Sequence, residues 1–152
     1  MKKSFFDFEI IKVPENDFSP DELSGNNQKG LILLFAGEET EKEELLTFLA
    51  KVFQAIQVDL NQDTYYINHQ EQPDLNWPHF LQKNKVQSVV IFGLLPEVFG
   101  IRFALPPYTL IEHQNIQYLR VDDLTAIYEE RQNGGKKMSG LLWRAIQQLK
   151  ID

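Results

Sequence analysis

The stretch from Gly30 to Ala36 reads GLILLFA, an apolar run without one polar side chain. Such a run is typical of a strand that is covered on both faces, as at the centre of a parallel sheet. A second strand of this kind is indicated by QSVVIF at residues 87–92. We therefore expect Leu31–Phe35 and Val89–Phe92 to form adjacent buried strands at the centre of one sheet.

The segments around these two strands alternate between helical and strand patterns. Thr40 with Glu43 matches a capping box, and an apolar face at helical spacing follows it, made by Leu45, Leu49, Val52, Phe53 and Ile56. Further strands are expected at 64–68, 108–112 and 116–121, and further helices at 76–85, 96–99, 122–130 and 137–150. This order predicts an α/β fold, with a mostly parallel central sheet in a three-layer α/β/α domain.

The first 29 residues differ in pattern from the rest of the chain. Residues 5–13 read FFDFEIIKV, in which apolar and acidic side chains first alternate as in a strand, and residues 14–30 are rich in loop-forming types. We divide the chain into an N-terminal arm and linker, 1–29, and an α/β domain, 30–152. We expect the arm to pair with a protein partner, a neighbouring copy or its own sheet edge through Phe5, Phe6, Phe8, Ile10 and Ile11.

The composition excludes several classes of function. The chain has no cysteine, which removes disulfides, thiolate metal sites and cysteine nucleophiles and favours a reducing compartment, the cytoplasm. Acids interrupt the first apolar residues, and no stretch approaches the ~20 apolar residues of a membrane span, so we expect neither a signal peptide nor a membrane protein. A net charge of -7 opposes strong binding to nucleic acid.

No motif in the sequence specifies a cofactor, a metal or a catalytic centre. The glycine-rich phosphate loops and the Gly-x-Ser-x-Gly elbow are absent, and the three histidines are not spaced as metal ligands. We expect Trp77 and Trp143 to pack in the core rather than to stack on a ligand. The apolar turn at 94–99 is compatible with a partner surface and with a lid on the sheet edge. His69 ends a predicted parallel strand, where ligand crevices form in α/β sheets.

Read in order, short segments between Gly30 and Ile151 resemble the uracil-DNA glycosylase superfamily. The segments are Gly37-Glu38-Glu39-Thr40, Tyr65-Tyr66-Ile67-Asn68, Val89-Val90-Ile91-Phe92-Gly93, and Lys137 with Trp143. They are similar, in this order, to the family's water-activating loop, to its strand that ends in a base-reading asparagine, to a strand closed by glycine, and to the lysine and tryptophan of the closing helix. The loop lacks the family's proline, and Arg120-Val121-Asp122-Asp123-Leu124 replaces its His-Pro-Ser.

The resemblance implies one of two functions. The first is a non-catalytic protein-interaction module like the psi accessory subunit of bacterial DNA polymerase III, which implies clamp-loader or replisome subunits as partners. The second is a residual glycosylase-like enzyme or a binder of nucleobases or other small ligands. In that case Glu38 would orient water, Asn68 would bind a base edge, and His69 or His113 would stabilise negative charge. The missing His-Pro-Ser, the missing proline and the negative charge favour the non-enzymatic role.

Overall fold

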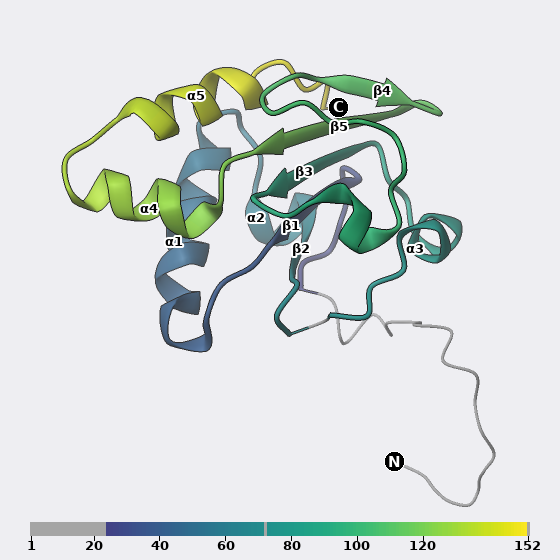
Figure 1. The fold of residues 1–152 in the computed structure, drawn as a ribbon, viewed down its shortest axis with the longest axis horizontal. Coiled ribbons are helices and arrows are strands. Elements are labelled where there is room, and N and C mark those ends of the chain that lie inside the picture. The colour runs from purple at the N-terminus through teal and green to yellow at the C-terminus, as the bar shows by residue number, and fades with distance from the viewer. Residues whose placement is uncertain (1–23, 72, 152) are drawn as a thin grey trace, which may run out of the picture.

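The computed structural model describes residues 24–71 and 73–151, and a five-stranded sheet forms the centre of this part (Figure 1). The strand order is β2-β1-β3-β5-β4. Four strands are parallel and β4 pairs antiparallel with β5 at one edge. The strands are β1 (Leu31–Phe35), β2 (Thr64–Asn68), β3 (Ser88–Phe92), β4 (Ile111–His113) and β5 (Ile116–Val121). The chain is therefore α/β with a mostly parallel sheet, as predicted.

Strands β1 and β3 are adjacent and every residue in both is buried, which confirms the prediction made for them. Because side chains alternate along a strand, each strand contributes to two separate hydrophobic clusters. Leu33 and Phe35 belong to the cluster on one face, and Ile32 and Leu34 belong to the cluster on the other. Burial on both faces explains why these segments are continuously apolar.

Three helices, α1 (Lys42–Gln54), α4 (Leu124–Gln132) and α5 (Lys137–Ile146), pack together on one face of the sheet (Figure 1). Helix α1 buries Leu45, Leu49 and Phe53, as its spacing predicts. The capping-box prediction is wrong, because a 3-10 turn at Glu39–Glu41 precedes the helix and places its N-cap at Glu41, which makes no capping hydrogen bond.

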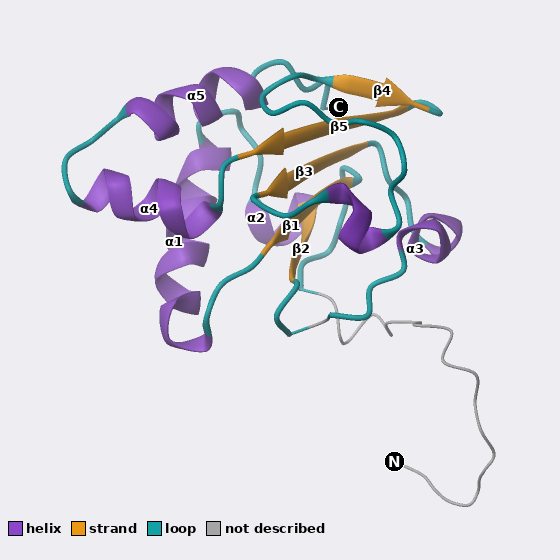
Figure 2. Cartoon of the chain, in the orientation of Figure 1, coloured by secondary structure: helices purple, strands orange, loops and turns teal. Residues whose placement is uncertain are grey.

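The other face carries α3 (Trp77–Lys83) and a 3-10 turn, η3 (Pro96–Phe99), drawn in purple in Figure 2. Trp77 is buried in the core as predicted, and its Nε1 donates to the Tyr118 hydroxyl at 3.0 Å. The same prediction is wrong for Trp143, which is 46% exposed. Helix α5 buries Leu142 and Ala145, and the two positions between them, Trp143 and Arg144, are exposed.

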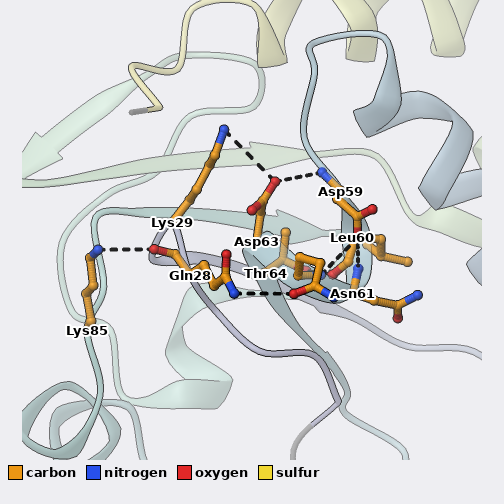
Figure 3. A network of polar contacts seen from close by, with 9 residues as sticks. Gln28, Lys29, Asp59, Leu60, Asn61, Asp63, Thr64 and Lys85 are labelled. Atoms are coloured by element: carbon orange, nitrogen blue, oxygen red, sulfur yellow. Dashed lines mark hydrogen bonds and ion pairs between the residues drawn. The ribbon is translucent and has the colours of Figure 1, made fainter.

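Residues 24–30, expected to be loop, are loop and are attached to the edge of the sheet. The Tyr66 amide donates to the Ser24 carbonyl at 3.0 Å. The Lys29 ammonium lies 4.0 Å from Asp63, which precedes β2 in the short helix α2 (Leu60–Asp63) (Figure 3). On the other side, Lys85 donates to the Gln28 carbonyl at 3.2 Å. The strand expected at 5–13, and with it the arm, lies outside the described residues.

Candidate functional site

The residues expected to form a ligand site come from the carboxyl ends of two neighbouring parallel strands. Phe35 of β1 pairs with Asn68 of β2, so Gly37-Glu38 and Asn68-His69 leave the sheet side by side. The two segments therefore lie close together. The chemistry of this edge depends on which side-chain atoms remain available to a ligand.

The amide of Asn68 is used within the protein. Its Oδ1 accepts from the backbone amides of Gly37 at 3.2 Å and Gln70 at 3.1 Å, and its Nδ2 donates to the Gly37 carbonyl at 2.9 Å. Both acceptor positions of Oδ1 are thus occupied, and the residue is only 6% exposed. Asn68 holds two loops together at a place where the resemblance implies a base-reading residue. Glu38, the expected water-orienting residue, is exposed to solvent.

His69 lies beside Asn68 but points toward the 3-10 turn η3. Its ring meets Phe99 edge-on, with ring centroids 5.2 Å apart. The Nδ1 atom is buried and has no hydrogen-bond partner in the described part of the chain. A buried polar atom without a partner is costly, and a bound water or ligand is one way in which its hydrogen bond can be satisfied.

Phe99 also lines an open cleft of about 870 Å³. Its lining includes Asp74, Asn76, Val98, Phe99 and Arg102, and it does not include Glu38, Asn68 or His69. The structure thus brings Asn68 and His69 together at the strand ends but does not gather the three expected catalytic residues around this cleft.

The other two histidines lie away from the strand ends of β1 and β2. His113 is in β4, at the opposite edge of the sheet from β2, and stacks on Phe103 with ring centroids 4.1 Å apart. His113 therefore does not share a site with Asn68. His79 is in α3. Within residues 24–71 and 73–151, no group of three or more His, Cys, Asp or Glu side chains is arranged to hold a metal ion.

The segment that replaces the family's His-Pro-Ser has structural contacts in this chain. The Asp123 side chain accepts from the Ala126 amide at 3.2 Å and caps α4. The Tyr108 hydroxyl donates to the Asp122 carboxylate at 2.6 Å. Burial, together with this hydrogen bond, raises the pKa of Tyr108 well above its ordinary value. Both carboxylates are engaged within the fold, one at a helix end and one with a tyrosine.

The exposed apolar side chains are predicted only in part by the sequence. Among the described residues, the large hydrophobic side chains that are exposed are Leu95, Val98 and Trp143. Leu95 and Val98 come from the apolar turn for which a partner surface was one of two readings. Trp143 follows the buried Leu142 directly in α5, so the apolar pattern alone does not show that its ring faces solvent. The arm residues Phe5, Phe6, Phe8, Ile10 and Ile11 lie outside the described residues.

Comparison with known proteins adds no relative: no protein-family profile and no curated protein sequence matches the chain. In the described part of the chain, no helix has both the length and the apolar character needed to cross a membrane.

Proposed function

We propose that the chain is a non-catalytic protein-interaction module with a uracil-DNA glycosylase-like, three-layer α/β/α fold and a cytoplasmic location. Its role would be similar to that of the psi accessory subunit of bacterial DNA polymerase III, with clamp-loader or replisome subunits as partners. The observation that carries the proposal is the engagement of Asn68 with Gly37. With both acceptor positions of Oδ1 occupied and the residue only 6% exposed, Asn68 offers no acceptor to the edge of a base.

The contacts of Asp122 and Asp123 support the same proposal. In a glycosylase this segment would face the departing base, whereas here it caps α4 and binds Tyr108. Neither contact supplies a group that stabilises negative charge on a leaving base, because both side chains are carboxylates.

The proposed binding element is the N-terminal arm, with its alternation of aromatic and acidic side chains. The attachment of Ser24 to Tyr66 supports a fixed point of departure from the edge of β2. A segment that starts at a sheet edge is well placed for β-strand addition to a partner. In the arm, Phe5, Phe6, Phe8, Ile10 and Ile11 form more apolar surface than a free tail usually exposes.

The test is an affinity purification from a lysate of the source organism with three forms of the full chain. We expect the wild type and the Leu95→Ser/Val98→Ser variant to recover the same replisome protein, and the Phe6→Ser/Phe8→Ser variant to lose it. The Leu95 and Val98 changes remove two exposed apolar side chains from the body instead. If only the Leu95→Ser/Val98→Ser variant lost the partner, the interface would lie at the η3 turn, and the role of the arm would be contradicted.

A residual enzyme or small-ligand binder is the second candidate, favoured by the buried, unpartnered Nδ1 of His69. The assay incubates the chain with single- and double-stranded uracil-containing DNA and measures abasic sites, with Asn68→Ala and Glu38→Gln as controls. Base release that is lost in both variants would establish this candidate. Absence of release, with no thermal shift from nucleobases, would eliminate it.

A further inference from the structure

A groove with an apolar floor lies between α1 and the pair α4 and α5, away from the strand ends. It holds about 560 Å³, within the usual range of about 300–1,000 Å³ for sites that take a small molecule or a few side chains. Phe48 and Val52 of α1, with Ala55 at its C-cap, line one side, and Gly140 and Trp143 of α5 line the other. Trp143 is 46% exposed at this groove. Tryptophan is among the residues that most often contribute large binding energies at protein interfaces.

Gly140 keeps the groove open. Glycine in the interior of a helix is disfavoured relative to alanine, so a structural reason for it is expected in the packing around it. Among the described residues, nothing lies within 4 Å of the position that a Cβ atom would take, so the packing in this part of the chain gives no such reason. The glycine therefore removes a side chain from the groove without relieving any internal contact.

Cations surround the apolar floor. Lys51, Arg131 and Lys136 line the groove and are exposed. The ion pairs found in the described residues are Lys29–Asp63 and Lys42–Glu71, and neither involves these three side chains. Among the described residues, Glu130 forms no ion pair with the neighbouring Arg131, and its carboxylate accepts from the Met138 amide at 2.8 Å.

The positive character extends along the end of the chain. Residues 131–150 contain five lysines and arginines and no acid, in a chain with a net charge of -7. A local excess of one sign against the overall charge indicates a partner of the opposite sign. The apolar floor requires that this partner also carry apolar side chains, which a peptide provides. A nucleic acid strand presents repeated phosphates instead, and the net charge of the chain repels it at long range.

We propose that the groove between α1 and α5 binds a segment of another protein in which acidic residues flank apolar ones. The apolar side chains of the segment would lie against Phe48 and Trp143, in the space left by Gly140, and its carboxylates would meet Lys51, Arg131 and Lys136. This surface goes beyond the proposed function because it does not use the N-terminal arm.

The test uses the full chain and tryptophan fluorescence. Trp143 reports on the groove, because the other tryptophan, Trp77, is 2% exposed. The probe is a synthetic amphipathic helical peptide with leucines on one face flanked by glutamates, and the control peptide carries lysine in place of each glutamate. We expect the acidic peptide to protect Trp143 from iodide in a saturable manner. Equal protection by the lysine peptide, or no protection by the acidic one, would overturn the proposal.

Two matched pairs of variants locate the binding. Gly140→Leu fills the groove and should weaken binding at least about tenfold, whereas Gly140→Ala, which also improves helix propensity, should retain most of the affinity. Lys136→Glu should weaken binding, whereas Lys137→Glu, at an exposed position outside the groove lining, should change it little. Unchanged binding to the Gly140→Leu variant would overturn the proposal. Thermal unfolding of this variant separates weaker binding from loss of the fold.

The arm of the same chain is itself acidic and aromatic, so the experiment includes the Phe6→Ser/Phe8→Ser variant. We expect this variant to bind the acidic peptide as tightly as the wild type does. Tighter binding would show that the arm occupies the groove and would overturn the assignment to another protein. Because the proposed function predicts an effect of these substitutions and the groove proposal predicts none, the two fail separately.

Discussion

The side-chain amide of Asn68 pairs with the peptide group of Gly37 as a strand residue would, accepting from its N–H at 3.2 Å and donating to its carbonyl at 2.9 Å. This exchange extends the contact between β1 and β2 beyond the last backbone pair, Phe35 with Asn68. The segment that resembles a base-reading strand end is therefore a structural junction between two loops.

Replacing Asn68 should lower stability. Asn68→Ala leaves the buried Gly37 peptide without its partner, and each buried group left unsatisfied costs about 1–3 kcal/mol. Asn61→Ala is the control, because Asn61 accepts a hydrogen bond from the Tyr66 hydroxyl at an exposed site. Urea unfolding of both variants measures the difference. Equal midpoints for Asn68→Ala and the wild type would show that the junction does not stabilise the fold.

Leu49→Ala should destabilise the protein by about 2–5 kcal/mol, because Leu49 is fully buried in the core face of α1 and its removal leaves a cavity. Glu44→Ala, on the exposed side of the same helix, should stay within about 0.5 kcal/mol of the wild type. Urea midpoints measure both effects. Equal shifts in the two variants would contradict the assignment of the buried face.

Gly93→Ala should lower the stability of the protein more than Gly134→Ala does. Gly93 ends β3 with a φ of +73°, and an added Cβ would lie 2.6 Å from the Cα atom of Asp123. Gly134→Ala separates conformational strain from this clash, because Gly134 has a φ of +90° and no described residue lies within 4 Å of its Cβ position. Strain alone costs about 1–2 kcal/mol, so thermal unfolding should show a larger loss for Gly93→Ala. A smaller loss would mean that the close approach to Asp123 relaxes freely.

Stability should fall at alkaline pH partly because of Tyr118. Burial raises the pKa of Tyr118 above its ordinary value of 10.0, while the Trp77 hydrogen bond partly opposes the shift. The unfolded chain therefore releases this proton at a lower pH than the folded chain, and the free energy of unfolding decreases as pH rises above about 10. Urea midpoints at about pH 8 and pH 11 should decline less for Tyr118→Phe than for the wild type. Equal declines would exclude a contribution from this tyrosine.

The sequence predicts the parts of the fold in which one physical signal dominates. The unbroken apolar runs locate β1 and β3, and the helical spacing of Leu45, Leu49 and Phe53 identifies the buried face of α1. At the start of α1 the prediction fails, because a 3-10 turn at Glu39–Glu41 forms where Thr40 and Glu43 match a capping box.

The candidate site is predicted less completely, because its features depend on contacts between distant segments. The adjacency of Gly37 and Asn68 follows from parallel pairing, but the occupation of the Asn68 amide is a hydrogen bond across 31 positions that no local pattern encodes. Trp143 directly follows the buried Leu142 in α5. Its hydrophobic side chain predicts burial, but the orientation of the helix leaves the ring at the surface.

The most direct measurement of the central claim is the affinity of the full chain for purified clamp-loader subunits of its source organism, by isothermal titration calorimetry. A non-catalytic module that binds through its arm should form a saturable complex with one of these subunits. The Phe6→Ser/Phe8→Ser variant should bind at least about tenfold more weakly, because buried aromatic side chains dominate such interfaces, and Leu95→Ser/Val98→Ser should bind as the wild type does. No complex with any subunit, or equal affinity of the wild type and the Phe6→Ser/Phe8→Ser variant, would contradict the claim.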